Sequence, residues 1–219
     1  MKINILTLFP NFFASPLQES ILKRAQDNDK VEFQIVNIRD FAQDKHHTTD
    51  LPPYGGGAGM VMKVEPIDLA LQSLGVEKGQ QDSWIVLTSA KGQKFTQQKA
   101  REWQKLKSLT IVCGHYEGVD QRVVDHLVDA EIRIGDYVLT GGEPAALAML
   151  DAVTRLVPGV VGNDESLEQE SHDQPGFLAH PQYTRPEKYK DWQVPEVLLS
   201  GNHEKIAEWR EKQARTVNR

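Results

Sequence analysis

Glycine is concentrated in three short segments of the chain, each with an aromatic residue or a carboxylate beside it. The segments are YGGGAGM at 54–60, CGHYEGVD at 113–120 and IGDYVLTGGEP at 134–144. Glycine allows positive φ angles and lets a ligand come close to the peptide groups. One such run is also typical of an ordinary turn, but three of them together favour a binding site.

The positions of these glycines exclude two common nucleotide-binding motifs. A dinucleotide-binding fingerprint needs Gly-x-Gly-x-x-Gly after an early strand, but the first apolar run leads into Phe9-Pro10-Asn11. A P-loop ends in Gly-Lys and then Ser or Thr, whereas the first segment ends in Ala58-Gly59-Met60. The second and third segments instead follow later predicted strands. We therefore expect a ligand between two loops at the carboxyl ends of adjacent strands.

Cysteine and histidine show no comparable pattern. The single cysteine, Cys113, lies in the apolar run LTIVC, which predicts a buried strand residue and excludes an intrachain disulfide. The seven histidines have no repeated metal-ligand spacing, and the adjacent His46 and His47 cannot easily bind one ion. The residues themselves therefore predict no metal site.

The elements that position the glycine segments alternate between short apolar runs and helical patterns. This alternation predicts an α/β fold with a mostly parallel sheet. A capping box, Ser15-Pro16-Leu17-Gln18, predicts the start of a first helix. The predicted strands lie at 2–9, 31–38, 83–88, 109–113 and 130–134, and the further helices at 66–74, 96–106, 120–128 and 144–156.

The pattern changes after Pro158. Residues 159–200 contain four prolines and few periodic apolar positions, which predicts a long connection of the kind that is usually functional or mobile. A last helix is expected from about Asn202, with Ile206 and Trp209 on one side. The expected domains are an α/β body at 1–160, a flexible linker at 161–200 and a small C-terminal helical part at 201–219.

The composition is that of a folded protein, with 219 residues of which 39% are hydrophobic and 26% charged. A net charge of −6 argues against broad, sequence-independent binding of nucleic acid. The charges are segregated, however, since residues 91–107 carry five Lys and one Arg against one Glu. That basic helix either contacts RNA phosphates or is a solvated face with Trp103 turned inward.

The sequence shows no secretory signal and no uninterrupted apolar run that could cross a membrane. A lone cysteine is typical of proteins in a reducing compartment. The expected location is therefore the cytoplasm.

Six strings in the same order resemble the bacterial tRNA (guanine-N1)-methyltransferases of the TrmD type, which belong to the SPOUT superfamily. The strings are YGGGAGMVMKVEP, VCGHYEGVDQRV, IGDYVLTGGE, DAVTRLVPGVVG, HPQYTRP and VPEVLLSGNH. The resemblance implies a SPOUT-like α/β domain with a C-terminal trefoil knot, S-adenosylmethionine as methyl donor, and a homodimer. The implied acceptor is N1 of the guanosine immediately 3′ of the tRNA anticodon. It also allows magnesium as an assisting ion and implies a tail longer than residues 201–219.

The resemblance also assigns binding roles to individual residues. Those implied to bind the donor, largely through backbone groups, are Ser89, Gly114, Tyr116, Gly118, Ile134, Gly135, Asp136, Tyr137, Val138, Leu139, Gly141 and Gly142. Those implied to contact the tRNA are Tyr54, Gly59, Met60, His180, Tyr183, Arg185 and His203.

Methylation of guanine N1 requires two further groups. A base must take the N1 proton, and negative charge then grows on O6, where a cation stabilises it. The resemblance gives the first role to Glu170, where the family has Asp, and the second to Arg155. Without the resemblance, Glu170 would be a solvated acid and Arg155 a cation facing the dipole of a helix end.

Two alternatives remain open from the sequence. One is a related SPOUT enzyme that acts on another RNA or on a ribose 2′-hydroxyl. The other is a donor-binding protein with impaired catalysis, because Glu170 and His172 stand where the family has Asp and Phe.

Overall fold

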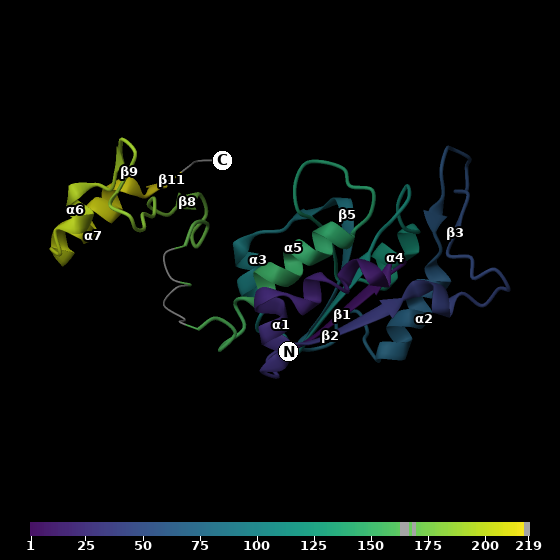
Figure 1. The fold of residues 1–219 in the computed structure, drawn as a ribbon. Coiled ribbons are helices and arrows are strands. Elements are labelled where there is room, and N and C mark those ends of the chain that lie inside the picture. The colour runs from purple at the N-terminus through teal and green to yellow at the C-terminus, as the bar shows by residue number, and fades with distance from the viewer. Residues whose placement is uncertain (163–166, 168–169, 217–219) are drawn as a thin grey trace. The chain divides into compact units, whose positions relative to one another are not determined.

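The computed structural model describes residues 1–162, 167 and 170–216, and the chain divides into two compact units (Figure 1). The first unit is Met1–Gly162 and the second is Asn163–Arg219. No helix in the described part of the chain is long and apolar enough to cross a bilayer.

Five parallel strands form the central sheet of the first unit, which confirms the predicted α/β class with its parallel sheet. β1 (Lys2–Thr7) lies between β2 (Glu32–Asn37) and β6 (Ser108–Cys113). β5 (Ser83–Lys94) lies between β6 and β7 (Ala130–Arg133). The central strands are apolar on both sides because helices cover both faces of a parallel sheet.

Helices lie on both faces of this sheet, as the contacts of two successive residues of β1 show. Leu6 belongs to one apolar cluster with Ile67 of α2 and Val123 of α4. The next residue, Thr7, hydrogen-bonds Glu143 of α5. Successive strand residues point to opposite faces, so α2 and α4 lie on one face and α5 on the other, where it packs with α1 and α3 (Figure 1). The bounds are α1 Ser20–Asp27, α2 Val64–Leu74, α3 Gln97–Trp103, α4 Gln121–His126 and α5 Glu143–Thr154.

Two side chains cap helices where the sequence predicted helix starts. Thr96 accepts a hydrogen bond from the backbone N–H of Lys99 at the start of α3. Asp120 accepts one from the N–H of Arg122 at the start of α4, and it also pairs with the Arg122 guanidinium at 2.7 Å. That cation lowers the pKa of Asp120 below its ordinary value. The α4 cap therefore stays ionised, and its charge suits the helix N-terminus.

The predicted start of the first helix at Ser15 is wrong. Ser15 has helical angles and its side chain makes no capping hydrogen bond, so the capping box does not form. Pro16–Gln18 is a single 3₁₀ turn, and α1 begins only at Ser20, after the extended residue Glu19. A capping-box sequence caps a helix only where its first residue has non-helical backbone angles. Two further 3₁₀ turns occur at Pro10–Phe13 and Ile38–Phe41.

β5 extends six residues beyond the predicted strand at 83–88 and ends at Lys94. Its pairing with β7 shifts register between Thr88 and Gln93. The added residues are mostly polar, so apolar alternation gave no signal for them. Gly92 is required here, because a Cβ atom would overlap the backbone between Glu131 and Ile132.

The second unit contains more secondary structure than predicted for residues 159–200. Three two-residue strands and a short helix occur there, one of the strands pairs with a fourth at 215–216, and such short strands carry no periodic pattern. α7 begins at His203, directly after the expected Asn202, whose side chain caps it by accepting from Lys205 N. The bounds are β8 Phe177–Leu178 paired with β11 Arg215–Thr216, β9 Lys188–Tyr189 paired with β10 Trp192–Gln193, α6 Glu196–Leu199 and α7 His203–Gln213.

A buried polar contact joins β1 to α5 and gives a test of the packing. Thr7 Oγ1 donates to Glu143 Oε1 at 2.7 Å, and the Glu143 side chain is only 3% exposed. We expect Thr7→Val to lower the free energy of unfolding by about 1–3 kcal/mol, because the buried carboxylate loses a donor. Urea denaturation followed by circular dichroism measures the change. Thr216→Val, at an exposed position, is the control, and equal stability of the Thr7 variant and the wild type would contradict the expectation.

Candidate active site

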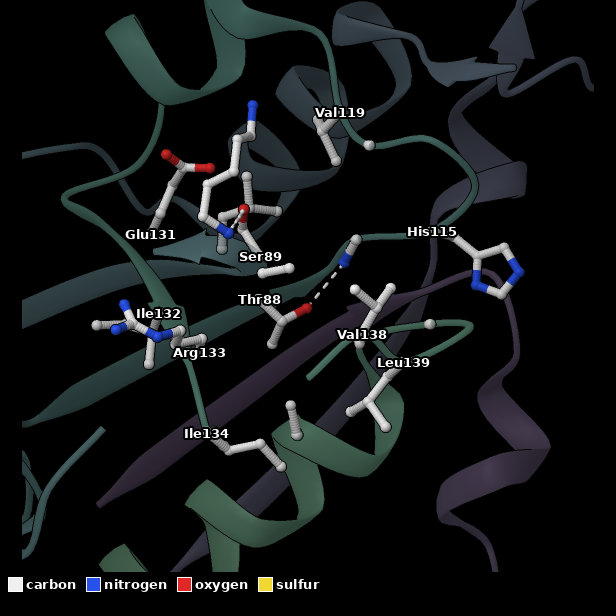
Figure 2. Close-up of a pocket in the computed structure, with 18 of the residues that line it drawn as sticks. Thr88, Ser89, His115, Val119, Glu131, Ile132, Arg133, Ile134, Val138 and Leu139 are labelled. Atoms are coloured by element: carbon white, nitrogen blue, oxygen red, sulfur yellow. Dashed lines mark hydrogen bonds between the residues drawn. The ribbon is translucent and has the colours of Figure 1, made fainter. Parts of the chain in front are cut away.

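A pocket of about 280 Å³ lies at the carboxyl ends of β6 and β7, beside the middle of β5 (Figure 2). Three segments line it: residues 89–91 of β5, the loop at 114–119 after β6 and the loop at 134–142 after β7. The volume is slightly below the roughly 300–1,000 Å³ typical of small-molecule sites. The carboxyl edge of a parallel sheet is where such sites are expected.

Thr88 of β5 contacts both the 114–119 loop and the 134–142 loop. Its hydroxyl accepts a hydrogen bond from Gly114 N at 2.9 Å, drawn in Figure 2, and lies 3.3 Å from the Val112 carbonyl. Gly142 N in turn donates to the Gly114 carbonyl at 2.8 Å. A Cβ atom at Gly142 would overlap Thr88 Oγ1 and lie 2.9 Å from Gly114 N. The glycine at 142 is therefore required by the close approach of three chain segments.

Charged groups of both signs line the pocket beside an apolar surface. Glu117 and Glu131 are the acidic side chains, and Lys91 and Arg133 are the basic ones. Such a mixture suits a ligand that has an apolar ring system together with groups of both charges. The apolar lining comes from Leu87, Val119, Ile132, Ile134, Val138 and Leu139.

Asp136 does not line the pocket, although its neighbours on both sides do. Its carboxylate pairs with Arg133 Nε at 2.8 Å instead. The hydrogen bond from Arg133 and the charge of that guanidinium lower the pKa of Asp136. Asp136 therefore keeps Arg133 turned toward the 134–142 loop, and Arg133 also donates to the carbonyl of Gly92.

The pocket brings together eleven of the twelve residues that the sequence predicted as donor contacts, all except Asp136. They come from segments far apart in the chain, since Ser89, Gly114 and Gly141 meet here. The pocket also includes Thr88, Glu131 and Ile132, which the sequence analysis missed. Thr88 carried one usable signal, because it is a polar residue at the end of an apolar run.

The first glycine segment lies beside the pocket without lining it. Met60 O accepts from Glu117 N at 3.1 Å, and Met62 N donates to Gly118 O at 2.9 Å. A Cβ atom at Gly59 would overlap the Glu117 side chain, which shows how closely the two loops approach. Tyr54, by contrast, is fully exposed.

The two predicted catalytic residues lie outside the pocket lining. Arg155 follows the last residue of α5 as its C-terminal cap and donates its N–H to Asp151 O. Glu170 belongs to the second unit, where its carbonyl accepts from Asp173 N at 3.1 Å. Both side chains are half-buried.

Three of the residues predicted to contact tRNA line a second pocket, of about 470 Å³, within the second unit. They are His180, Tyr183 and Arg185. The fourth, His203, opens α7 and is not part of the lining. The second pocket also includes Trp209, for which the sequence had predicted only a place on one side of the helix.

Cys113 is fully buried at the end of β6, as predicted. Burial, followed by the nearby Glu143 charge, raises the pKa of its thiol well above the ordinary value. The residue is therefore a packing group rather than a nucleophile. Among residues 1–162, 167 and 170–216, no group of three or more His, Cys, Asp or Glu side chains is placed to hold a metal ion.

Comparisons with known proteins show which family the chain is similar to. A family model described as "tRNA (Guanine-1)-methyltransferase TrmD" matches residues 1–219. Curated proteins named tRNA (guanine-N(1)-)-methyltransferase are similar along the whole chain. One from Dehalococcoides mccartyi strain 195 is 52% identical, covering 100% of this chain and 88% of its own. One from Carboxydothermus hydrogenoformans is 53% identical (98% and 83%), and one from Citrifermentans bemidjiense is 54% identical (97% and 84%).

Proposed function

Because the chain belongs to the TrmD family of tRNA (guanine-1)-methyltransferases, we propose that it methylates N1 of the guanosine immediately 3′ of the tRNA anticodon. The observation that carries the proposal is the pocket at the carboxyl edge of the sheet, where the two glycine loops at 114–119 and 134–142 meet residues 89–91 of β5. The substrate would be tRNA, the methyl donor S-adenosylmethionine, and the location the cytoplasm, where tRNA is found.

The residues of the pocket fit this donor. S-adenosylmethionine supplies an electrophilic methyl group on a sulfonium, and it also carries an adenine, an ammonium and a carboxylate. The apolar side chains suit the adenine, while Glu117 and Glu131 suit the cationic groups. Lys91 and Arg133 suit the carboxylate. A Cβ atom at Gly114, Gly141 or Gly142 would overlap neighbouring groups of the protein, so glycine at these positions lets the loops pack closely around the site.

Glu170 and Arg155 would carry out the proton and charge chemistry. Glu170 would take the proton from guanine N1, a role that a carboxylate within hydrogen-bond reach fills well. Arg155 stabilises the negative charge that this creates on O6. Alignment of the two reacting atoms contributes further, up to roughly 7–11 kcal/mol in favourable cases.

The proposal extends to the arrangement of the chain. Residues 1–160 would form the donor-binding domain with a trefoil knot at its C-terminal part, 161–200 the linker with the catalytic loop, and 201–219 the tRNA-binding tail. The resemblance also allows a magnesium ion, but the described residues contain no group of carboxylates placed to bind one. No step of the reaction is assigned to this ion.

A homodimer is part of the proposal. Tyr137 and Val138, on the 134–142 loop, are 56% and 84% exposed, and Phe9 is 43% exposed. Large apolar side chains on a loop beside a binding pocket suit contact with another protein surface. A second copy of the chain would bury them and complete the site. Sedimentation equilibrium tests the dimer.

The decisive experiment is transfer of labelled methyl groups to an unmodified tRNA transcript, followed by mapping of the modified nucleotide. We expect label on N1 of the guanosine 3′ of the anticodon, and none when adenosine replaces it. Label on a ribose or on a different RNA would identify a related enzyme instead. Donor binding in calorimetry with no product in a single turnover would indicate a binding protein.

A further inference from the structure

The second pocket has a lining that the methyl-transfer chemistry does not use. The segment 180–185 forms one side, and residues of α6 and α7 form the other. Its volume of about 470 Å³ exceeds that of the donor pocket. All of these residues belong to the second unit, so the pocket is formed by that unit alone.

Trp209 provides the main aromatic surface of this pocket. Its ring lies 6.3 Å from the rings of both His180 and Tyr183, centre to centre. Ile206, Trp209 and Arg210 occupy positions i, i+3 and i+4 of α7, so the helix presents them on one face. Each ring is inclined to Trp209, at 61° and 59°, rather than stacked flat on it. The Trp209 face is therefore not covered by a parallel ring from either neighbour.

Positive charge dominates the polar part of the lining. Arg185 and Arg210 are both present, and Glu187 is the acidic side chain among the lining residues. An arginine presents a planar set of donors that matches a phosphate group. A flat aromatic surface beside arginines is the arrangement that proteins use for unpaired nucleotides, because every base has a face that can stack.

We propose that the pocket around Trp209 takes one unpaired nucleotide of the substrate RNA, with its base against Trp209 and its phosphate near Arg185 and Arg210. The inference rests on the proposed function, since it takes the RNA to be tRNA. It concerns a nucleotide other than the methylated guanosine. This pocket then selects RNA in which an unpaired base can leave its stack.

The test pairs a protein variant with an RNA variant. Binding is measured between the full chain and an anticodon stem-loop RNA, in which each loop nucleotide except the target guanosine is made abasic in turn. For the wild type, one abasic position should weaken binding about tenfold or more, the range expected for one base stacked on an aromatic ring. Trp209→Leu should weaken binding of the intact RNA by a similar factor, and the same abasic position should then cost nothing further.

Trp192→Leu is the matched control, because Trp192 is an exposed tryptophan of the same unit outside the pocket. If both tryptophan variants lose affinity equally, or if every abasic position still weakens binding to Trp209→Leu, the proposal is wrong. Circular dichroism and the affinity for S-adenosylmethionine verify that the variant is folded.

A second pair of variants avoids any change in the interior. Arg210→Gln and Lys212→Gln each remove one positive charge from α7, but only Arg210 lines the pocket. Arg210→Gln should reduce the salt dependence of RNA binding by about one phosphate contact, and Lys212→Gln should not. An equal salt dependence for the two variants would overturn the phosphate assignment. If the wild type methylates the transcript but Trp209→Leu binds the RNA as tightly as the wild type does, this inference alone is wrong. If the wild type does not methylate the transcript at all, the proposed function is wrong.

Discussion

Glu170→Gln should lower kcat for methyl transfer by roughly 10²–10⁴-fold while the affinity for S-adenosylmethionine stays the same. Glutamine keeps the size of the side chain and removes its ability to accept the N1 proton. Single-turnover transfer to a tRNA transcript gives the rate, and titration calorimetry gives the donor affinity. A loss of rate without a loss of donor binding separates the proton-transfer step from the assembly of the pocket.

Two variants serve as controls for this result. Asp173→Asn removes the same charge three residues along the chain and should keep the wild-type rate, because no role in the reaction is assigned to it. Glu170→Asp restores the residue that the family carries and should keep activity within about 10²-fold, the cost of moving a reacting group by 1 Å. A wild-type rate for Glu170→Gln would transfer the role of the base to another group.

Gly142→Ala should weaken binding of S-adenosylmethionine by roughly 5- to 150-fold, the factor that corresponds to about 1–3 kcal/mol of overpacking. The added Cβ would overlap Thr88 Oγ1 and approach Gly114 N to 2.9 Å. Either Thr88 or the 114–119 loop must then move, and both line the pocket. Calorimetric titration of the variant with the donor measures the effect.

Gly162→Ala is the matched control, because a Cβ atom at that position meets nothing within 4 Å and the residue lies outside the pocket. It should bind the donor as the wild type does. If Gly142→Ala also bound the donor normally, the packing of Gly142 against Thr88 would not be what shapes the site, and the donor would have to bind elsewhere. Thermal unfolding of both variants shows whether a loss of affinity reflects a loss of folding.

The order of strands and helices in the first unit could be predicted because each element carries its own local pattern. The run LTIVC predicted β6, and Thr96 and Asp120 predicted the starts of α3 and α4. The predictions failed where a residue type has its expected effect only in one backbone conformation, and the rest of the fold determines that conformation. Ser15 has the right type for a helix cap but adopts a helical backbone itself.

The candidate donor site was predicted in part because glycine marks positions where the backbone must lie close to something else. Gly114 and Gly142 each carry that signal alone, but the group that they both approach, Thr88, lies 26 residues before the first of them. Arg133 shows the same limit. Its guanidinium is held in place by hydrogen bonds to Asp136 and to the Gly92 carbonyl, and the sequence around Arg133 does not predict these contacts.

The α/β class, the glycine loops and the family could be predicted from the residues alone, because periodicity and contiguous motifs are properties of neighbouring residues. The folded structure was needed to establish which of those loops meet at one pocket, that Asp136 pairs with Arg133 instead of lining the pocket, and that Trp209 lies beside Tyr183 and His180. Contacts of this kind join residues far apart in the chain. Their geometry depends on how the strands of the sheet are ordered and on which face each helix covers, and no local pattern records either.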